Sequence, residues 1–333
     1  MNDKTMTIDQ VHERLESVKS TEKYAYLSDV EFSSEGLTFT ETGETFELDE
    51  WGFIKLGRYF GIPKSYVKKM TSDLLLKNLE FWREENEHVQ TRFFFWNGEL
   101  ELVSDIDDKL IQPKHALRAL GTLVGSNTFI SELMFDPDRF YITFIFNDSK
   151  REIESNGEYY NISGGVQILQ HYNTTEPIVV KTVLYREDDG TTLTFFDKDD
   201  RVKLTRNTME GVLDDLHTSA TTVYRNLDYH LNLYYETSQS LVKGSLSSFI
   251  RQVTNGTGVG NRAVNHMAET LINTYQDKSN PPTLFDVIQV VTSTAQQTQG
   301  LEGKTNLQTL AGSLTTHYDH VTEPCPSCNR VEL

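Results

Sequence analysis

The last part of the chain brings together side chains that could bind a metal ion. His317 and His320 stand three positions apart, so they would share one face of a helix. Cys325 and Cys328 follow as a Cys-x-x-Cys pair, and they are the only two cysteines of the chain. Two imidazoles and two thiolates are a ligand set typical of tetrahedral zinc sites. The pattern predicts one zinc ion bound by these four residues; the alternative is a loose tail with two reduced thiols.

A second group of side chains could bind the phosphates of a nucleic acid. Between positions 55 and 70, in the segment "KLGRYFGIPKSYVKKM", the chain carries five basic residues and no acidic one. Ammonium and guanidinium groups bind nucleic acids by neutralising phosphate charges. The predicted contacts are Arg58, Lys64, Ser65, Lys68 and Lys69. The alternative is that this segment only packs, with its lysines solvated on an exposed face.

The elements that must position these basic residues are two helices joined by a short turn. Apolar residues recur at helical spacing through residues 51–60, and Gly61 can adopt the positive φ that ends a helix. Pro63 suits the first turn of a second helix, whose basic side would face solvent. Gly57 leaves room for that second helix to cross closely. This order is typical of a helix-turn-helix.

Three further kinds of segment could carry chemistry, but each has a simpler interpretation. The stretch 255–262, "NGTGVGNR", follows a helical pattern and lacks lysine, so it predicts a helix-to-helix loop rather than a phosphate-binding loop. The stretch 92–96, "RFFFW", could stack bases, although burial between two layers is the favoured interpretation. Carboxylate runs at 105–108 and 197–200 could bind a divalent ion, yet they read as solvated turns. No catalytic residue is nominated.

Composition limits the class of protein. The 333 residues carry a formal net charge of -18 and a pI near 4.9, which excludes a surface that is basic throughout. No apolar run approaches the ~20 residues of a membrane span, and the N-terminal stretch reads as a capped amphipathic helix rather than a signal segment. We therefore expect a cytoplasmic protein without a membrane partner, in the host cytoplasm if a phage encodes it. The two cysteines exclude a disulfide framework.

The periodicity predicts an α+β fold whose character changes near residue 206. Residues 1–206 read as a mixed domain with short antiparallel sheets, a hairpin around Asn97 and Gly98, and the helix-turn-helix-like corner. Residues 207–318 read as an all-helical domain, and residues 319–333 as a tail with the metal knuckle. One long helix, at about 208–242, carries apolar positions that a small domain would struggle to cover. We therefore expect a homo-oligomer.

Part of the chain resembles a known family. The corner "FIKLGRYFGIPKSYVKKM", the hairpin "TRFFFWNGELELVSD" and the helical segment that ends at residue 120 resemble, in order and spacing, the phage and plasmid proteins called domain of unknown function nine-thirty-two. The late segment "PPTLFDVIQVVTSTAQQ" also resembles that family, whereas the central strands lack its Asn-Ser-rich turn and its Cys-Asn-Gly segment. The resemblance implies a phage or plasmid origin and a setting among replication and recombination genes. It supplies no catalytic residues.

Together these features predict a non-catalytic accessory protein of phage or plasmid DNA metabolism that binds single- or double-stranded nucleic acid. Two alternatives stay open. The acidic surface could bind a basic host protein, as in host interaction or counter-defence. A metal-dependent enzyme could assemble its site from residues far apart in the sequence. A basic patch on an acidic surface favours nucleic-acid binding, a uniformly negative surface favours the host-protein alternative, and convergent carboxylates in a pocket favour the enzyme.

Overall fold

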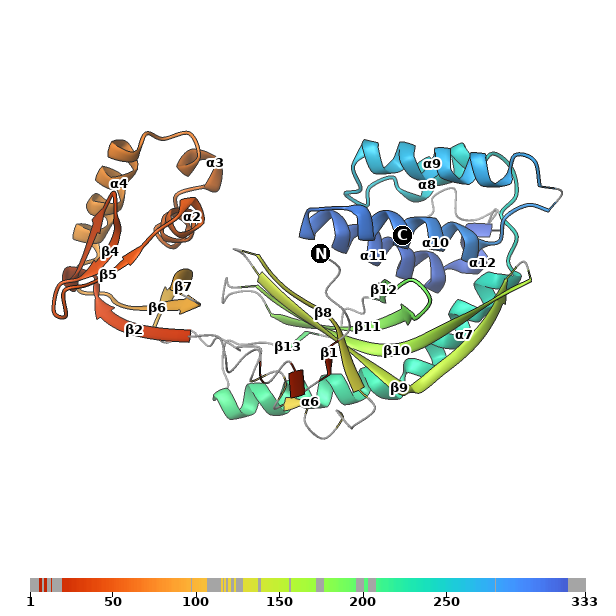
Figure 1. Ribbon diagram of the computed structural model, residues 1–333, viewed down its shortest axis with the longest axis horizontal. Coiled ribbons are helices and arrows are strands. Elements are labelled where there is room, and N and C mark those ends of the chain that lie inside the picture. Colours follow the sequence, from red (N-terminus) through yellow and green to blue (C-terminus); the bar gives the residue numbers. More distant parts are fainter. Residues whose placement is uncertain are drawn as a thin grey trace.

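The computed structural model has an α+β fold, so the predicted fold class is confirmed. It describes residues 6–7, 9–10, 13, 20–96, 98–106, 115, 117, 119–120, 123, 128–136, 139–155, 157–171, 177–195, 201–202, 208–278 and 280–322. Within these ranges the strands form three antiparallel sheets, and helices pack against them (Figure 1).

The described residues between positions 20 and 106 form an N-terminal lobe of two small sheets and their helices. One sheet has the order β2 (Ser20–Tyr26), β6 (Gln90–Trp96) and β7 (Glu99–Asp105). The other has the order β3 (Val30–Ser33), β4 (Gly36–Phe39) and β5 (Glu44–Glu47). The helical elements are η1 (Leu27–Asp29), α2 (Glu50–Tyr59), α3 (Lys64–Val67) and α4 (Ser72–Glu85).

Aromatic side chains fill the core of the N-terminal lobe. Phe93 and Phe95 of β6 are fully buried. The Phe93 ring lies 5.4 Å from that of Phe39, and the Phe95 ring stacks on Phe46 at 3.9 Å. Phe94, on the opposite face of the strand, is also buried. The burial favoured for this aromatic stretch is therefore confirmed at positions 93–95, and so is the hairpin that joins β6 to β7.

The remaining strands form a seven-stranded antiparallel sheet. Its order is β1 (Met6–Thr7), β8 (Thr128–Asp136), β9 (Arg139–Ser155), β10 (Glu158–His171), β11 (Ile178–Arg186) and β12 (Thr191–Phe195), with β13 (Arg201–Val202) paired to β11. Successive residues of a strand point to opposite faces. In β9, Phe144 and Phe146 therefore belong to one core, while Ile145 packs with Val183 and Tyr185 on the other face.

Helices pack against this sheet and share its cores. α6 (Met209–Arg225) covers the face that carries Phe144 and Phe146. α7 (Leu227–Gln239), α10 (Leu284–Gln297) and α11 (Leu301–Thr316) form a second core with Leu193 and Phe195 of β12. α8 (Leu246–Val253), α9 (Asn261–Tyr275) and α12 (Tyr318–Thr322) are further helices of the described residues. α6 and the α8–α11 layer lie on opposite sides of the sheet (Figure 1). None of the described helices is long and apolar enough to cross a membrane.

The hydrophobic cores show which segments of the chain pack together. Among the described residues, those that form the core of the N-terminal lobe lie between Ala25 and Val103. The two large cores each combine strands of the seven-stranded sheet with helices that follow residue 206. The change near residue 206 is thus a change from strands to helices within shared cores.

The long helix expected at about 208–242 is interrupted, which corrects the sequence-based expectation. Asn226, with φ −93° and ψ 0°, ends α6 and precedes α7. Val223, Leu227 and Leu231 are at most 3% exposed, because the sheet and neighbouring helices cover them. The argument that an uncovered helix requires self-association is therefore wrong. A homo-oligomer stays a prediction without that support.

Candidate functional site

The predicted corner is present and its turn is built by glycine. Asp49 begins α2 by accepting a hydrogen bond from the backbone N–H of Gly52 at 2.7 Å. Gly61, with φ 74°, follows the helix, and the Ile62 N–H donates to the Gly57 carbonyl at 2.7 Å. A Cβ on Gly57 would lie 2.7 Å from Cγ2 of Val67, so only glycine allows α3 to approach this closely. Two helices meeting at Gly61 are confirmed.

The second helix of the corner is much shorter than a DNA-reading helix. α3 spans four residues, which is about 6 Å of helix. A recognition helix lies in the major groove and contacts several base edges along its length. The corner is therefore helix-turn-helix-like in its turn, but α3 cannot read a groove in that way.

The five predicted nucleic-acid contacts are all exposed on this corner: Arg58, Lys64, Ser65, Lys68 and Lys69. Lys55, the remaining basic residue of the segment, is buried instead and forms an ion pair with Glu101 at 2.8 Å. It belongs to the core of the lobe and contributes nothing to the surface charge that a nucleic acid would meet.

The ammonium groups of two of these lysines lie over an aromatic ring. Trp51, at the start of α2, is 37% exposed. The Nζ atoms of Lys64 and Lys68 lie 4.3 Å and 5.2 Å from its ring centroid, within the range of cation–π attraction. Lys68 also forms an exposed ion pair with Glu50 at 3.1 Å. We call Trp51, Lys64, Lys68 and Lys69, together with Arg58, the basic corner.

Further aromatic side chains are exposed on α3 and α4. Tyr66 of α3 is 62% exposed. On α4, Phe81 and Trp82 are exposed and their rings contact each other at 5.6 Å. Lys77 on the same helix is exposed as well. Exposed basic and aromatic side chains thus occur on both helices, as they do where proteins bind unpaired bases. α4 also carries four acidic residues: Asp73, Glu80, Glu84 and Glu85.

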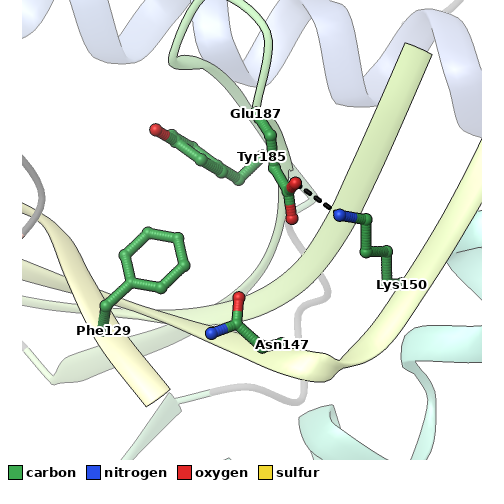
Figure 2. Close-up of a pocket in the computed structure, with 5 residues that line it drawn as sticks. All are labelled: Phe129, Asn147, Lys150, Tyr185 and Glu187. Atoms are coloured by element: carbon green, nitrogen blue, oxygen red, sulfur yellow. Dashed lines mark hydrogen bonds and ion pairs between the residues drawn. The ribbon is translucent and has the colours of Figure 1, made fainter. Parts of the chain in front are cut away.

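A second candidate site is an open cavity of about 390 Å³ on the seven-stranded sheet, which we call the sheet cavity. Five residues line it: Phe129 of β8, Asn147 and Lys150 of β9, Tyr185 of β11, and Glu187 just after β11 (Figure 2). It lies on the face opposite Phe144 and Phe146. The Phe129 and Tyr185 rings meet edge to face at 5.6 Å.

An ion pair organises the polar side of the sheet cavity. The Lys150 ammonium lies 2.5 Å from Oε2 of Glu187, and the Ser163 hydroxyl donates to Oε1 at 2.6 Å. Burial acts to raise the pKa of Glu187, but the hydrogen bonds and charge of Lys150, with the Ser163 hydroxyl, outweigh it and lower that pKa. Burial, followed by the charges of Glu187, Asp189 and Glu132, raises the pKa of Tyr185, which therefore stays a neutral phenol at neutral pH.

The lowered pKa of Glu187 predicts a pH-dependent contribution to stability. A carboxylate whose pKa is lower in the folded state stabilises the protein above its ordinary pKa of 4.5, and this contribution is lost as the pH falls through the folded value. We expect Glu187→Gln to lower the melting temperature at pH 7 and to differ less and less from wild type between about pH 5 and pH 3. Thermal unfolding across that range measures this. Glu152→Gln, an exposed change on β9, is the control and should follow the wild type at every pH.

Of the four predicted zinc ligands, two lie within the described residues and two lie outside them. His317 ends α11 as its C-terminal cap, and His320 lies in the separate helix α12. The expectation that both imidazoles share one continuous helix face is therefore wrong. Cys325 and Cys328 lie outside the described residues, so the zinc site stays a prediction. Within the described ranges, no group of three or more His, Cys, Asp or Glu side chains could hold a metal ion.

The glycine-rich stretch forms the loop predicted for it. Gly256 and Gly258 have φ of 80° and 73° and lie between α8 and α9, so the helix-to-helix loop is confirmed.

The predicted carboxylate runs are described at one position. Asp105, in the first run, accepts a hydrogen bond from the Tyr59 hydroxyl at 2.8 Å. The other carboxylates of the two runs, at 107–108 and 197–200, lie outside the described residues.

Sequence reasoning missed the sheet cavity. Its residues come from three separate segments around positions 129, 147–150 and 185–187, and only the pairing of β8, β9, β10 and β11 brings them together. The available signal was weak: "FNDSK" and "LYRED" interrupt otherwise apolar strand patterns with polar residues.

No family model, curated protein or solved structure matches this chain. The resemblance to domain of unknown function nine-thirty-two stays a prediction.

Proposed function

We propose that this protein binds nucleic acid through the basic corner, as a non-catalytic accessory protein of phage or plasmid DNA metabolism. The observation that carries the proposal is the position of the Lys64 and Lys68 ammonium groups over the exposed Trp51 ring. A base that replaces these ammonium groups over the indole can stack on it, and the displaced ammonium groups can neutralise the adjacent phosphates.

Single-stranded nucleic acid is the favoured ligand. Stacking on Trp51 or Tyr66 requires an unpaired base, and the short helix α3 offers no element for the major groove. The net charge of -18 opposes binding of any polyanion, and Glu50 competes with phosphate for Lys68. We therefore expect weak binding without sequence preference that decreases steeply with salt.

Charge reversal of the corner should abolish this binding. We expect wild-type protein to retain a single-stranded oligonucleotide of about 20 nucleotides at ~20 mM salt, where screening is weakest. The triple variant Lys64→Glu, Lys68→Glu, Lys69→Glu should not retain it, because three phosphate-neutralising charges become repulsive. Its melting temperature should stay within about 2 °C of wild type, since exposed ion pairs contribute little to stability. Fluorescence anisotropy and thermal unfolding measure the two effects.

A matched control separates the corner from net charge. The variant Lys243→Glu, Arg251→Glu, Lys278→Glu changes the formal charge by the same amount at exposed positions outside the N-terminal lobe. It should bind the oligonucleotide nearly as wild type does. Equal loss in both triple variants would show that only overall charge matters. No binding of single- or double-stranded DNA or RNA by wild type at ~20 mM salt would favour a host protein partner recognised through the acidic surface.

The origin, the oligomeric state and the metal content expected from the sequence are part of the same proposal. A phage or plasmid origin would place the protein in the cytoplasm, and a homo-oligomer would multiply weak contacts along one strand.

Zinc in the tail would bind through His317, His320, Cys325 and Cys328. Elemental analysis of purified protein should then give about one zinc per chain, and a value below about 0.2 would exclude this site. A metal-dependent enzyme remains the further alternative.

A further inference from the structure

The sheet cavity has two chemically different sides. Phe129 and Tyr185 form an aromatic side, and Lys150, Glu187 and Asn147 form a polar side that faces it across the cavity (Figure 2). A pocket that pairs an aromatic wall with a few placed donors and acceptors is suited to a flat ring with polar groups along one edge.

The polar side keeps hydrogen-bonding capacity for a ligand. A carboxylate offers about four acceptor positions and an ammonium three donors. Glu187 uses one oxygen for Lys150 and the other for the Ser163 hydroxyl, so a further position on each oxygen is open to a ligand. The backbone N–H of Glu187 donates to the Asn161 carbonyl at 2.9 Å, which fixes the residue against β10. The polar edge is therefore held in place before any ligand arrives.

The charge around the sheet cavity disfavours an anion. Lys150 is the one cationic side chain among the described lining residues, and Glu187 already neutralises it. Glu132 and Asp189 also act on Tyr185, but Lys304 and Arg186 form ion pairs with them. A phosphate or carboxylate ligand would therefore find no net positive charge among these groups, whereas a neutral ring needs none.

We propose that the sheet cavity binds a guanine base, as a nucleoside or as an unpaired base of a nucleic acid. The base would pack against Phe129 and Tyr185. Its carbonyl O6 would accept a hydrogen bond from Lys150, and its N1–H and N2–H groups would donate to the Glu187 carboxylate. This order of one donor followed by acceptors matches guanine and opposes adenine, whose ring N1 would face the carboxylate lone pairs. The site is separate from the basic corner, so the proposal does not depend on the function proposed above.

Nucleoside binding tests this assignment. Calorimetry or ligand-observed NMR with guanosine, inosine and adenosine should show guanosine bound about tenfold more tightly than adenosine, because each hydrogen bond to a charged group is worth about that much. Inosine, which lacks the exocyclic amino group, should lie between them. Equal affinity for the three nucleosides, or no binding of guanosine at millimolar concentration, would overturn the proposal.

Variants locate the binding. Glu187→Gln should weaken guanosine binding about tenfold by removing the charged acceptor, and Glu152→Gln on the same sheet should leave it unchanged. Phe129→Leu removes the ring without touching the ion pair and should also weaken binding, which keeps the test decisive if Glu187→Gln fails to fold. The triple charge-reversal variant of the basic corner should bind guanosine as wild type does. Full affinity in Glu187→Gln and Phe129→Leu would place the nucleoside elsewhere and refute the assignment.

Discussion

Replacing Gly312 by alanine is expected to lower the free energy of unfolding by about 3 kcal/mol. α11 crosses the edge of β12 so closely that a Cβ on Gly312 would lie 2.1 Å from the carbonyl oxygen of Thr194 and 2.7 Å from its carbonyl carbon. Both of those atoms belong to the backbone of a paired strand, so no side chain can rotate to relieve the contact. The helix or the strand must move, and the surrounding core moves with it.

Gly303 provides the matched control in the same helix. A Cβ there would lie 3.0 Å from Cγ2 of Thr298, a methyl group that can shift. Gly303→Ala should change stability by less than about 1 kcal/mol, because the gain in helix propensity offsets the tight contact. Denaturant unfolding of both variants at 25 °C measures the difference. If Gly312→Ala unfolds with the wild-type midpoint, α11 does not pack on β12 as described.

The contact at Gly312 also explains how the edge strand of the sheet is protected from pairing with another chain. β12 is the last strand of the sheet order, and an open edge strand invites pairing with another chain. α11 covers that edge because glycine lets its backbone approach. A Gly312→Ala variant that remains folded should therefore aggregate more readily than wild type on partial unfolding.

The parts of the fold that were predictable depend on short-range signals. The corner at Gly61 needs only a helix-ending glycine, a following proline and two apolar faces, all within twenty residues. The start of α10 is similar, because Thr283 and Asp286, three positions apart in the sequence, form a capping box. In each case the deciding contacts lie within one or two turns of helix, so the local pattern contains them.

The parts that were missed depend on contacts between distant segments. The break at Asn226 has no proline or glycine to announce it; α6 and α7 instead follow two different stretches of the sheet. The sheet cavity arises from strand register, and register is set by pairing partners rather than by the residues that line a face. Glu187 and Lys150 are 37 positions apart, and no spacing rule connects them.

Lys55 shows that local sequence also does not reveal whether a charged side chain is exposed or buried. It stands in the basic segment and counts toward its positive charge, yet its ammonium is buried against β7, where it donates to the Leu100 carbonyl at 2.7 Å and to Glu101 at 2.8 Å. Helix periodicity places it beside residues that are exposed, and only the packing of α2 on β7 reveals which side it faces.

Glu101→Ala is expected to lower the free energy of unfolding by about 3 kcal/mol, because it leaves the Lys55 ammonium buried without its counter-charge. The expected loss of stability comes from the desolvation of an unpaired charge rather than from the strength of the ion pair itself. Burial raises the pKa of Glu101, and the nearby charge and hydrogen bond of Lys55 offset this only in part, so the carboxylate is under-compensated even in the wild type. The ion pair thus contributes less than the cost of leaving one partner alone.

A double variant that removes both charges gives a sharper test of this ion pair. Lys55→Met with Glu101→Leu removes both charges and keeps apolar volume, so its stability should return to within about 1 kcal/mol of wild type or exceed it. Denaturant unfolding of the two single variants and the double variant completes the cycle, and a non-additive recovery is the expected sign of direct contact. Oligonucleotide binding by the double variant should match wild type, because Lys55 is buried. If it instead binds as poorly as the triple variant of the basic corner, Lys55 reaches the nucleic acid and its assignment to the core is wrong.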